Sequence, residues 1–309
     1  MSVLLVIIGA SFLAIPALLR DVGRAATPAT WSRWCLCAGW FGVTTVEAGL
    51  VTTAGPTILK AAGVPALAAA CERTLAPLQP GGPLTGWLAA AASVWLPGAL
   101  LVGAGRARRT RRNAAVEPCV GRHQTRQGID LVVVPSRDAL AYSVSARGPQ
   151  VVVSQELVDR LNPDQLDLVV RHELAHLQRG HQRHLTTAVA LETALGPLAR
   201  ATTGELRLAV ERAADEEAAG DDIDRRRHLR AALLFCAAQP AGALTTLSPA
   251  SMVAARVGAL TTAPVRPSIT DRALLHAPAV LLAFAATGAL TGWGEHISRV
   301  IAMAGRCPA

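Results

Sequence analysis

The stretch VVRHELAHLQRGH, residues 169–181, places two histidines four positions apart with a glutamate directly after the first. On an α-helix, residues four apart lie one turn apart on the same face, so His172 and His176 point the same way. Two imidazoles arranged like this can bind one Zn²⁺ ion at about 2.0–2.1 Å. Glu173 is turned by about 100° from His172, which places its carboxylate beside the ion rather than on it. The spacing predicts a metal site with an adjacent base.

The predicted chemistry is hydrolysis of a peptide bond. Zn²⁺ lowers the pKa of a bound water molecule towards neutrality, and Glu173 can take the proton of that water and later give it to the leaving amine. The alternative is a solvated helix face with two uncoordinated histidines, because a His-Glu-x-x-His pattern also arises by chance. The surrounding sequence favours the metal.

The motif lies in the second half of a segment that has the features of a complete helix. Asn162 is a suitable N-cap, Pro163 suits the first helical position, and Gln165 stands where a capping-box partner belongs. Gly180 predicts the end of this helix, which places His181 and His184 at the surface or behind the ligands.

A third ligand follows on a second predicted helix, at about residues 204–219. In the segment ERAAD, Glu211 and Asp215 stand one turn apart and face the same way. Glu211 completes a His₂Glu site with one open position, and Asp215 can orient a ligand histidine through its other ring nitrogen. The alternative is a solvated acidic face, which is what most charge runs are. The other acidic residues of this helix are expected to be exposed: Glu205, Glu216 and Glu217.

Long apolar segments indicate a membrane protein. Hydrophobic residues make up 51% of the 309 residues, and the mean hydropathy is +0.34. About 20 helical residues cross a bilayer core, and four segments approach this length with at most one charge, Glu47: residues 1–19, 34–54, 86–105 and 277–294. The alternatives are buried helices of a soluble protein and, for the first segment, a cleaved signal peptide. The first segment has no basic region before it, so it is interpreted as an anchor.

The arginines predict an orientation in the membrane. They concentrate in residues 20–33 and 106–112 and before the fourth segment, where Arg256, Arg266 and Arg272 are interpreted as its positive flank. Positive flanks stay in the cytoplasm, so the N-terminus, residues 55–85 and the C-terminus are expected outside. The run RARRTRR has no interleaved aromatic residues and is expected to contact anionic lipid headgroups rather than nucleic acid. Cys71 and Cys307 would both lie on the oxidising side, where a disulfide between them is a hypothesis.

Between the third and fourth apolar segments the chain becomes charged and contains three β-branched runs. Residues 129–135, 140–144 and 150–154 are predicted to form an antiparallel meander of three strands. The apolar stretch LTTAVALETALGPLA, which Glu192 interrupts, is expected to lie against the membrane or to close the cleft.

HELAH followed by ERAAD in a chain with several apolar segments resembles the membrane-embedded gluzincin peptidases. Two families compete: the BlaR/MecR-type metallopeptidases and the HtpX and CAAX prenyl protease type. The strand, the tight turn at Gly148-Pro149 and the layout of three spans, protease domain and fourth span are closer to BlaR/MecR. The resemblance implies one Zn²⁺ per chain bound by His172, His176 and Glu211, with Glu173 as the base. The penicillin-binding sensor domain of the antibiotic-sensing members is expected to be absent, because only about fifteen residues follow the last span.

Gluzincins bind an extended peptide along an exposed strand edge, and candidates for that edge are Val151, Val152, Ala141 and Tyr142. The expected fold is a mainly α membrane protein with about four transmembrane helices and a cytoplasmic α+β zincin-like domain. The expected domains are a membrane region at 1–112, a zinc metallopeptidase domain at 113–272, and a last helix with a short outer tail at 273–309.

The expected function is that of a multi-pass metalloendopeptidase of a bacterial plasma membrane that cleaves a protein or peptide, with a transcriptional repressor as the leading candidate. The expected partners are this substrate and the lipid bilayer, without direct contact to nucleic acid, and a homodimer is left open. Two alternatives are an HtpX-like quality-control protease and a zinc-binding receptor or scaffold without turnover.

Overall fold

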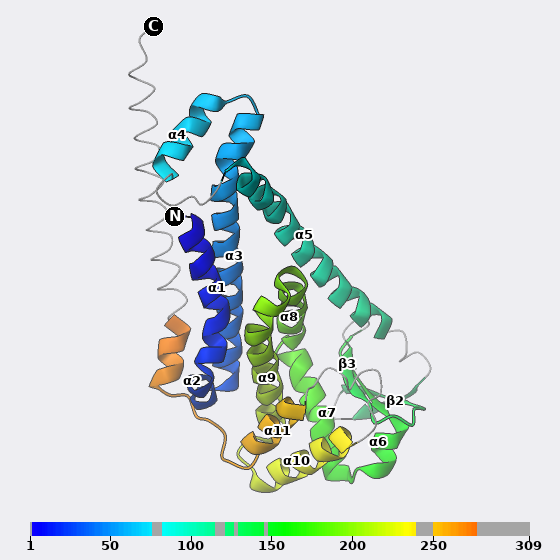
Figure 1. Ribbon diagram of the computed structural model, residues 1–309. Helices are drawn as coiled ribbons and strands as arrows, with labels where there is room; N and C mark the ends of the chain where they lie inside the picture. Colours follow the sequence, from blue (N-terminus) through cyan, green and yellow to red (C-terminus); the bar gives the residue numbers. More distant parts are fainter. Residues whose placement is uncertain are drawn as a thin grey trace.

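The computed structural model describes residues 2–75, 82–114, 121–126, 129–144, 148–238 and 250–276. The chain is mainly helical with one small sheet, as predicted (Figure 1). The helices are α1 (Ser2–Leu18), α2 (Arg20–Ala25), α3 (Pro28–Ala61), α4 (Pro65–Leu75), α5 (Pro83–Ala114), α6 (Gln155–Arg160), α7 (Pro163–Gln178), α8 (His181–Leu195), α9 (Pro197–Ala219), α10 (Ile223–Ala238) and α11 (Ala250–Ala259). The strands are β1 (Arg122–Arg126), β2 (Ile129–Val134), β3 (Ala141–Val144) and β4 (Gln150–Ser154).

Two of the described helices, α3 and α5, are long and apolar enough to cross a membrane. Helix α1 is apolar but shorter, at 17 residues, and it packs along α3 (Figure 1). Glu47, the one charged residue of the predicted second segment, has its Oε2 atom buried. The predicted fourth segment at 277–294 and Cys307 lie outside the described residues, so that span and the disulfide stay predictions.

Helices α8 and α9 form a hairpin that rises between α3 and α5 (Figure 1). Near its tip, Leu191 and Ala199 pack with Val43 of α3 and Leu96 of α5. Glu192, whose charge interrupts the apolar run, accepts hydrogen bonds within the hairpin, at 2.6 Å from Thr203 Oγ1 and 2.9 Å from an Arg207 guanidinium nitrogen. The apolar stretch therefore packs against the two candidate spans.

The sheet has four strands in the order β1-β2-β4-β3, so the predicted three-stranded antiparallel meander is wrong. Strand β2 pairs with β4 in parallel, and β3 pairs with β4 antiparallel at the edge. Strand β1, which pairs antiparallel with β2, was not predicted, because its sequence RHQTR is polar. After β2 the chain forms β3 at the edge of the sheet and then returns as β4, which lies between β2 and β3. A pattern of alternating residues does not specify this order of strands.

The sheet positions α7. Alternate residues of the two central strands, among them Val133 and Val153, point to one face and pack against Val170 of α7. The predicted capping box is confirmed: Asn162 Oδ1 accepts from the Gln165 amide at 2.9 Å, and Gln165 Oε1 accepts from the Asn162 amide at 3.1 Å. The helix ends before Gly180, whose φ of 64° is left-handed and reverses the chain into α8.

A buried carboxylate joins the C-terminal part of the described chain to the start of α3. Asp271 lies in a short helix at residues 269–276, and its Oδ1 accepts from the Thr27 amide at 2.8 Å and the Thr27 hydroxyl at 2.7 Å. Its Oδ2 accepts from the amide and hydroxyl of Ser268. Burial opposes ionisation, but these hydrogen bonds outweigh it and lower the pKa of Asp271 to about 2.

We expect Asp271→Asn to lower the melting temperature of the detergent-solubilised protein by roughly 3 °C at pH 7, because charge-assisted hydrogen bonds are lost. The folded-state pKa lies below the unfolded value of about 3.9. The ionised carboxylate therefore stabilises the fold above about pH 4, and this stabilisation is lost as the pH falls towards 2. The difference between wild type and variant should be constant from about pH 5 to 8 and shrink below about pH 4. Asp224→Asn, at an exposed site, is the matched control; a difference that persists unchanged at about pH 3 would contradict this account.

Candidate metal centre

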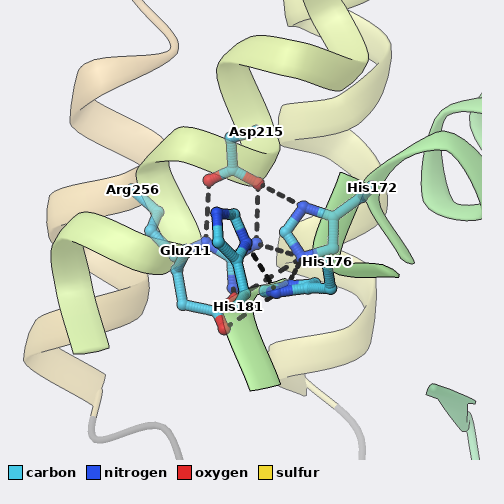
Figure 2. A network of polar contacts seen from close by, with 6 residues as sticks. All are labelled: His172, His176, His181, Glu211, Asp215 and Arg256. Atoms are coloured by element: carbon cyan, nitrogen blue, oxygen red, sulfur yellow. Dashed lines mark hydrogen bonds and ion pairs between the residues drawn. The ribbon is translucent and has the colours of Figure 1, made fainter. Parts of the chain in front are cut away.

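Helix α7 presents His172 and His176 on one face, as its four-residue spacing predicts. Both side chains are buried, with 7% and 6% of their surface exposed, and their Nε2 atoms lie 3.1 Å apart (Figure 2). Two imidazole nitrogens that face each other at this distance must share either a proton or a cation, because their lone pairs repel. The pair is arranged as two ligands of one metal ion are.

Glu211 on α9 completes the cluster. Its Oε2 lies 3.5 Å from His172 Nε2, and its Oε1 lies 3.7 Å from His176 Nε2. The three residues offer ligand atoms that all lie within 4.8 Å of one another, which makes them a group that can hold a metal ion. Ligands at 2.0–2.1 Å in a tetrahedral site stand roughly 3.3 Å apart, so the spacing fits Zn²⁺ with small adjustments. The structure thus brings together the three predicted ligands.

Two further side chains contact the Nδ1 atoms of the two imidazoles, the ring nitrogens that do not face each other. Asp215 Oδ1 lies 3.0 Å from His172 Nδ1, an ion-pair distance. His181 Nδ1 lies 3.1 Å from His176 Nδ1, and His181 is buried with 5% exposed (Figure 2). Such partners set the tautomer and orientation of a ligand histidine. His181 is therefore placed behind a ligand, one of the two positions expected for it, and not at the surface.

Arg256 corrects the interpretation of the arginines. It was expected to flank a transmembrane segment, but its guanidinium is buried in the metal centre, 2.8 Å from Glu211 Oε2 and 2.7 Å from Asp215 Oδ1 (Figure 2). A sequence feature indicates this placement: Arg256 stands four residues after Met252 and four before Leu260, so it lies on the same buried face of α11 as Met252, and Leu260 follows just past the end of the helix.

The electrostatics of the cluster call for a cation. Burial lowers the pKa of His172, but its contacts with Asp215 and Glu211 outweigh burial and raise the pKa to about 10. Burial lowers the pKa of His176 to about 4, although the charge of Glu211 acts in the opposite direction. Burial would raise the pKa of both carboxyls, yet Arg256 and His172 hold that of Asp215 at about 2 and that of Glu211 well below its usual range. Both carboxylates stay ionised and Arg256 balances one of their two negative charges, so the remaining charge favours a proton or a cation at the imidazoles.

Glu173 lies beside the cluster and is half-buried. Burial raises the pKa of its carboxyl, which Ser143 of β3 contacts through a side-chain hydrogen bond. Strand β3 is the edge strand next to α7, so Ala141 and Tyr142 do lie at a sheet edge. Val151 and Val152 do not, because β4 is paired on both sides and both valines are fully buried; the prediction that they bind substrate at an edge is wrong.

The acidic face of α9 is less exposed than expected. Glu217 is exposed and pairs with Arg179 at 2.6 Å, whereas Glu205 and Glu216 are half-buried. Helix α9 also begins at Pro197, seven residues before the predicted start. These additional turns of α9 pack against α8 in the α8–α9 hairpin, and the predicted helix boundaries left them out.

The His₂Glu cluster can hold a metal ion, and α3 and α5 are long and apolar enough to cross a membrane, two features that a membrane-associated metallopeptidase combines. The chain matches the family described as BlaR1 peptidase M56 over residues 84–257, more than half of its length, and it belongs to this family. The matched range runs from α5 to α11 and includes every residue of the cluster. No curated protein and no solved structure matches the chain.

We expect His172→Ala and Glu211→Ala each to abolish stoichiometric metal binding, because two ligands cannot hold the ion in a site built for three. Metal content after gel filtration is measured by inductively coupled plasma mass spectrometry. His123→Ala, at an exposed histidine of β1, is the matched control and should keep about one ion per chain. Full metal content in the Glu211 variant would contradict the assignment of the third ligand.

We expect His181→Ala to weaken metal binding by about 10-fold without lowering the number of ions bound at saturation, since it removes the partner of His176 and no ligand. Affinity is measured by competition with a chromophoric chelator. His181→Asn, which keeps a polar group facing His176, should lose less. An affinity equal to that of the wild type in the alanine variant would show that the contact with His181 does not orient His176.

Proposed function

We propose that the chain is an integral membrane zinc metalloendopeptidase that hydrolyses a peptide bond with Glu173 as the general base. The observation that carries this proposal is the buried group of His172, His176 and Glu211, with Glu173 next to it on the same helix. A zinc ion, when bound, supplies a Lewis acid that polarises a carbonyl and lowers the pKa of water.

The side chains around the cluster support the proton transfers of such a reaction. Glu173, made more basic by burial, accepts the proton of the attacking water and delivers it to the amine that leaves. The Ser143 hydroxyl orients the Glu173 carboxylate from the side of β3. Asp215 and His181 hold the two ligand imidazoles, so the site needs little rearrangement during turnover.

The substrate is proposed to be an extended polypeptide paired with the free edge of β3. The outer edge of β3 is not paired with another described strand, and this strand lies beside α7. Pairing through the backbone at Ala141 and Tyr142 would bring a peptide bond towards Glu173 without requiring a particular sequence.

The membrane arrangement is proposed to be multi-pass with the catalytic part in the cytoplasm. The last turns of α5 carry the basic run 106–112, most of which is exposed, and positive flanks remain on the cytoplasmic side. A cytosolic transcriptional repressor is the proposed substrate, in a pathway of regulated proteolysis.

We expect Glu173→Gln to lower turnover by at least about 100-fold, the usual contribution of a general base, while metal content stays that of the wild type. Membranes that contain wild type or variant are compared by quantitative proteomics, in which a substrate is lost only with the wild type. Glu217→Gln, at an exposed glutamate of α9, is the matched control.

Loss of one or a few proteins would support regulated cleavage, whereas loss of many unrelated membrane proteins would instead identify a quality-control protease. Equal cleavage by wild type and Glu173→Gln would contradict the role of Glu173. If the wild type binds zinc but cleaves no protein, the chain would instead be identified as a zinc-binding receptor or scaffold.

A further inference from the structure

Arg256, on α11, reaches into the metal centre. Its Nη2 donates to Asp215 Oδ1 at 2.7 Å, its Nε donates to Asp215 Oδ2 at 2.8 Å, and its Nη1 lies 2.8 Å from Glu211 Oε2. One guanidinium thus contacts a predicted metal ligand and, at the same time, the carboxylate that faces another ligand, His172 (Figure 2).

The two carboxylates need such a partner. Glu211 and Asp215 stand four residues apart on α9, so both project from one face and repel each other. They are also mostly withdrawn from water, with side chains 19% and 3% exposed, so solvent screens the repulsion weakly. A buried carboxylate is stable only when it is paired and hydrogen-bonded. Arg256 meets this need for both carboxylates.

The geometry requires an arginine rather than any cation. The bidentate pair with Asp215 uses two nitrogens of the planar guanidinium, which leaves the third for Glu211. A lysine carries a single ammonium and cannot hold both carboxylates in fixed orientations.

The position of Arg256 depends on how α11 is held. Leu260, at its C-terminal end, packs with Leu168 of α7 and Leu229 of α10. Arg226 of α10 donates to the Ala259 carbonyl at 2.8 Å and to the Gly220 carbonyl at 3.1 Å, which joins the end of α11 to the end of α9. The packing of Leu260 and the hydrogen bonds of Arg226 therefore hold the helix that carries Arg256, and neither involves a predicted metal ligand.

We propose that Arg256 is a positioning residue of the metal centre, which holds Glu211 and Asp215 in the orientations that bind the ion and align His172. This inference rests on the proposed metal-binding function of the cluster. Ligand carboxylates in metal sites are themselves hydrogen-bonded, and removal of such partners costs about 10–100-fold in metal affinity. If Arg256 acted chiefly as a positive charge that competes with the ion, its removal would instead increase the metal affinity.

The test measures the affinity of the full-length chain in detergent micelles for Zn²⁺ and Co²⁺, by chelator competition. We expect Arg256→Gln to bind Zn²⁺ about 10–100-fold more weakly than the wild type and Arg256→Lys to fall between the two. Arg227→Gln, which removes an exposed arginine of α10, is the matched control and should bind like the wild type. The visible spectrum of bound Co²⁺ should change in Arg256→Gln, because the ligand field responds to the orientation of Glu211.

Equal or tighter metal binding in Arg256→Gln, with an unchanged Co²⁺ spectrum, would overturn the proposal. If Arg256→Gln does not fold, as judged by helicity and gel filtration, Arg256→Lys decides: wild-type affinity and spectrum overturn the proposal, and weaker binding with a changed spectrum supports it. These readouts do not depend on turnover. A wild type that binds Zn²⁺ without cleaving substrates would refute the peptidase alone, and a wild type that binds no metal would refute the proposed metal centre itself.

Discussion

The structure depends on the burial of two carboxylates opposite two imidazoles. Glu211 and Asp215 project from α9 towards His172 and His176 on α7, in a region from which most water is removed. Buried charges of one sign are stable only beside charges of the other sign. Arg256 supplies part of the compensating positive charge. His172, with its pKa raised to about 10, supplies the rest by taking up a proton, which a bound metal ion would replace with a larger positive charge. The cluster has the charge and spacing of a cation site.

Helix α9 connects this site to the part of the chain that can lie in a membrane. One face of α9 carries Leu206 and Val210, which pack with Trp31 and Trp34 of α3, and Thr202 donates a hydrogen bond to the Leu13 carbonyl of α1. Another face of the same helix carries Glu211 and Asp215. A displacement of α1 or α3 therefore acts on the helix that holds a predicted metal ligand. Asp271, bonded to Thr27 at the start of α3, forms a second connection through the segment that follows α11.

The sequence predicted those parts of the site that local spacing determines. The histidine pair, its capping box and the Glu211–Asp215 pair each lie within one or two helical turns, and the helical period places them. The sheet order was wrong because β-strand pairing is a long-range choice: the chain skips a place between β2 and β3, which turns Val151 and Val152 into central residues. Arg256 was misassigned because charge near an apolar segment indicates topology on average, while its burial follows from how α11 packs on α9. The sequence left two positions open for His181, because the turn at Gly180 determines the direction in which its side chain points.

The most direct measurement of the central claim is X-ray absorption at the zinc edge of the purified, full-length protein. The account predicts about one zinc per chain in a shell of nitrogen and oxygen atoms at about 2.0–2.1 Å, with the multiple scattering of two imidazoles. Helices α7 and α9 would each then contribute to one ion. A shell that contains sulfur at about 2.3 Å, or zinc that lacks the imidazole pattern, would contradict the account, because the ion would then be bound away from His172, His176 and Glu211.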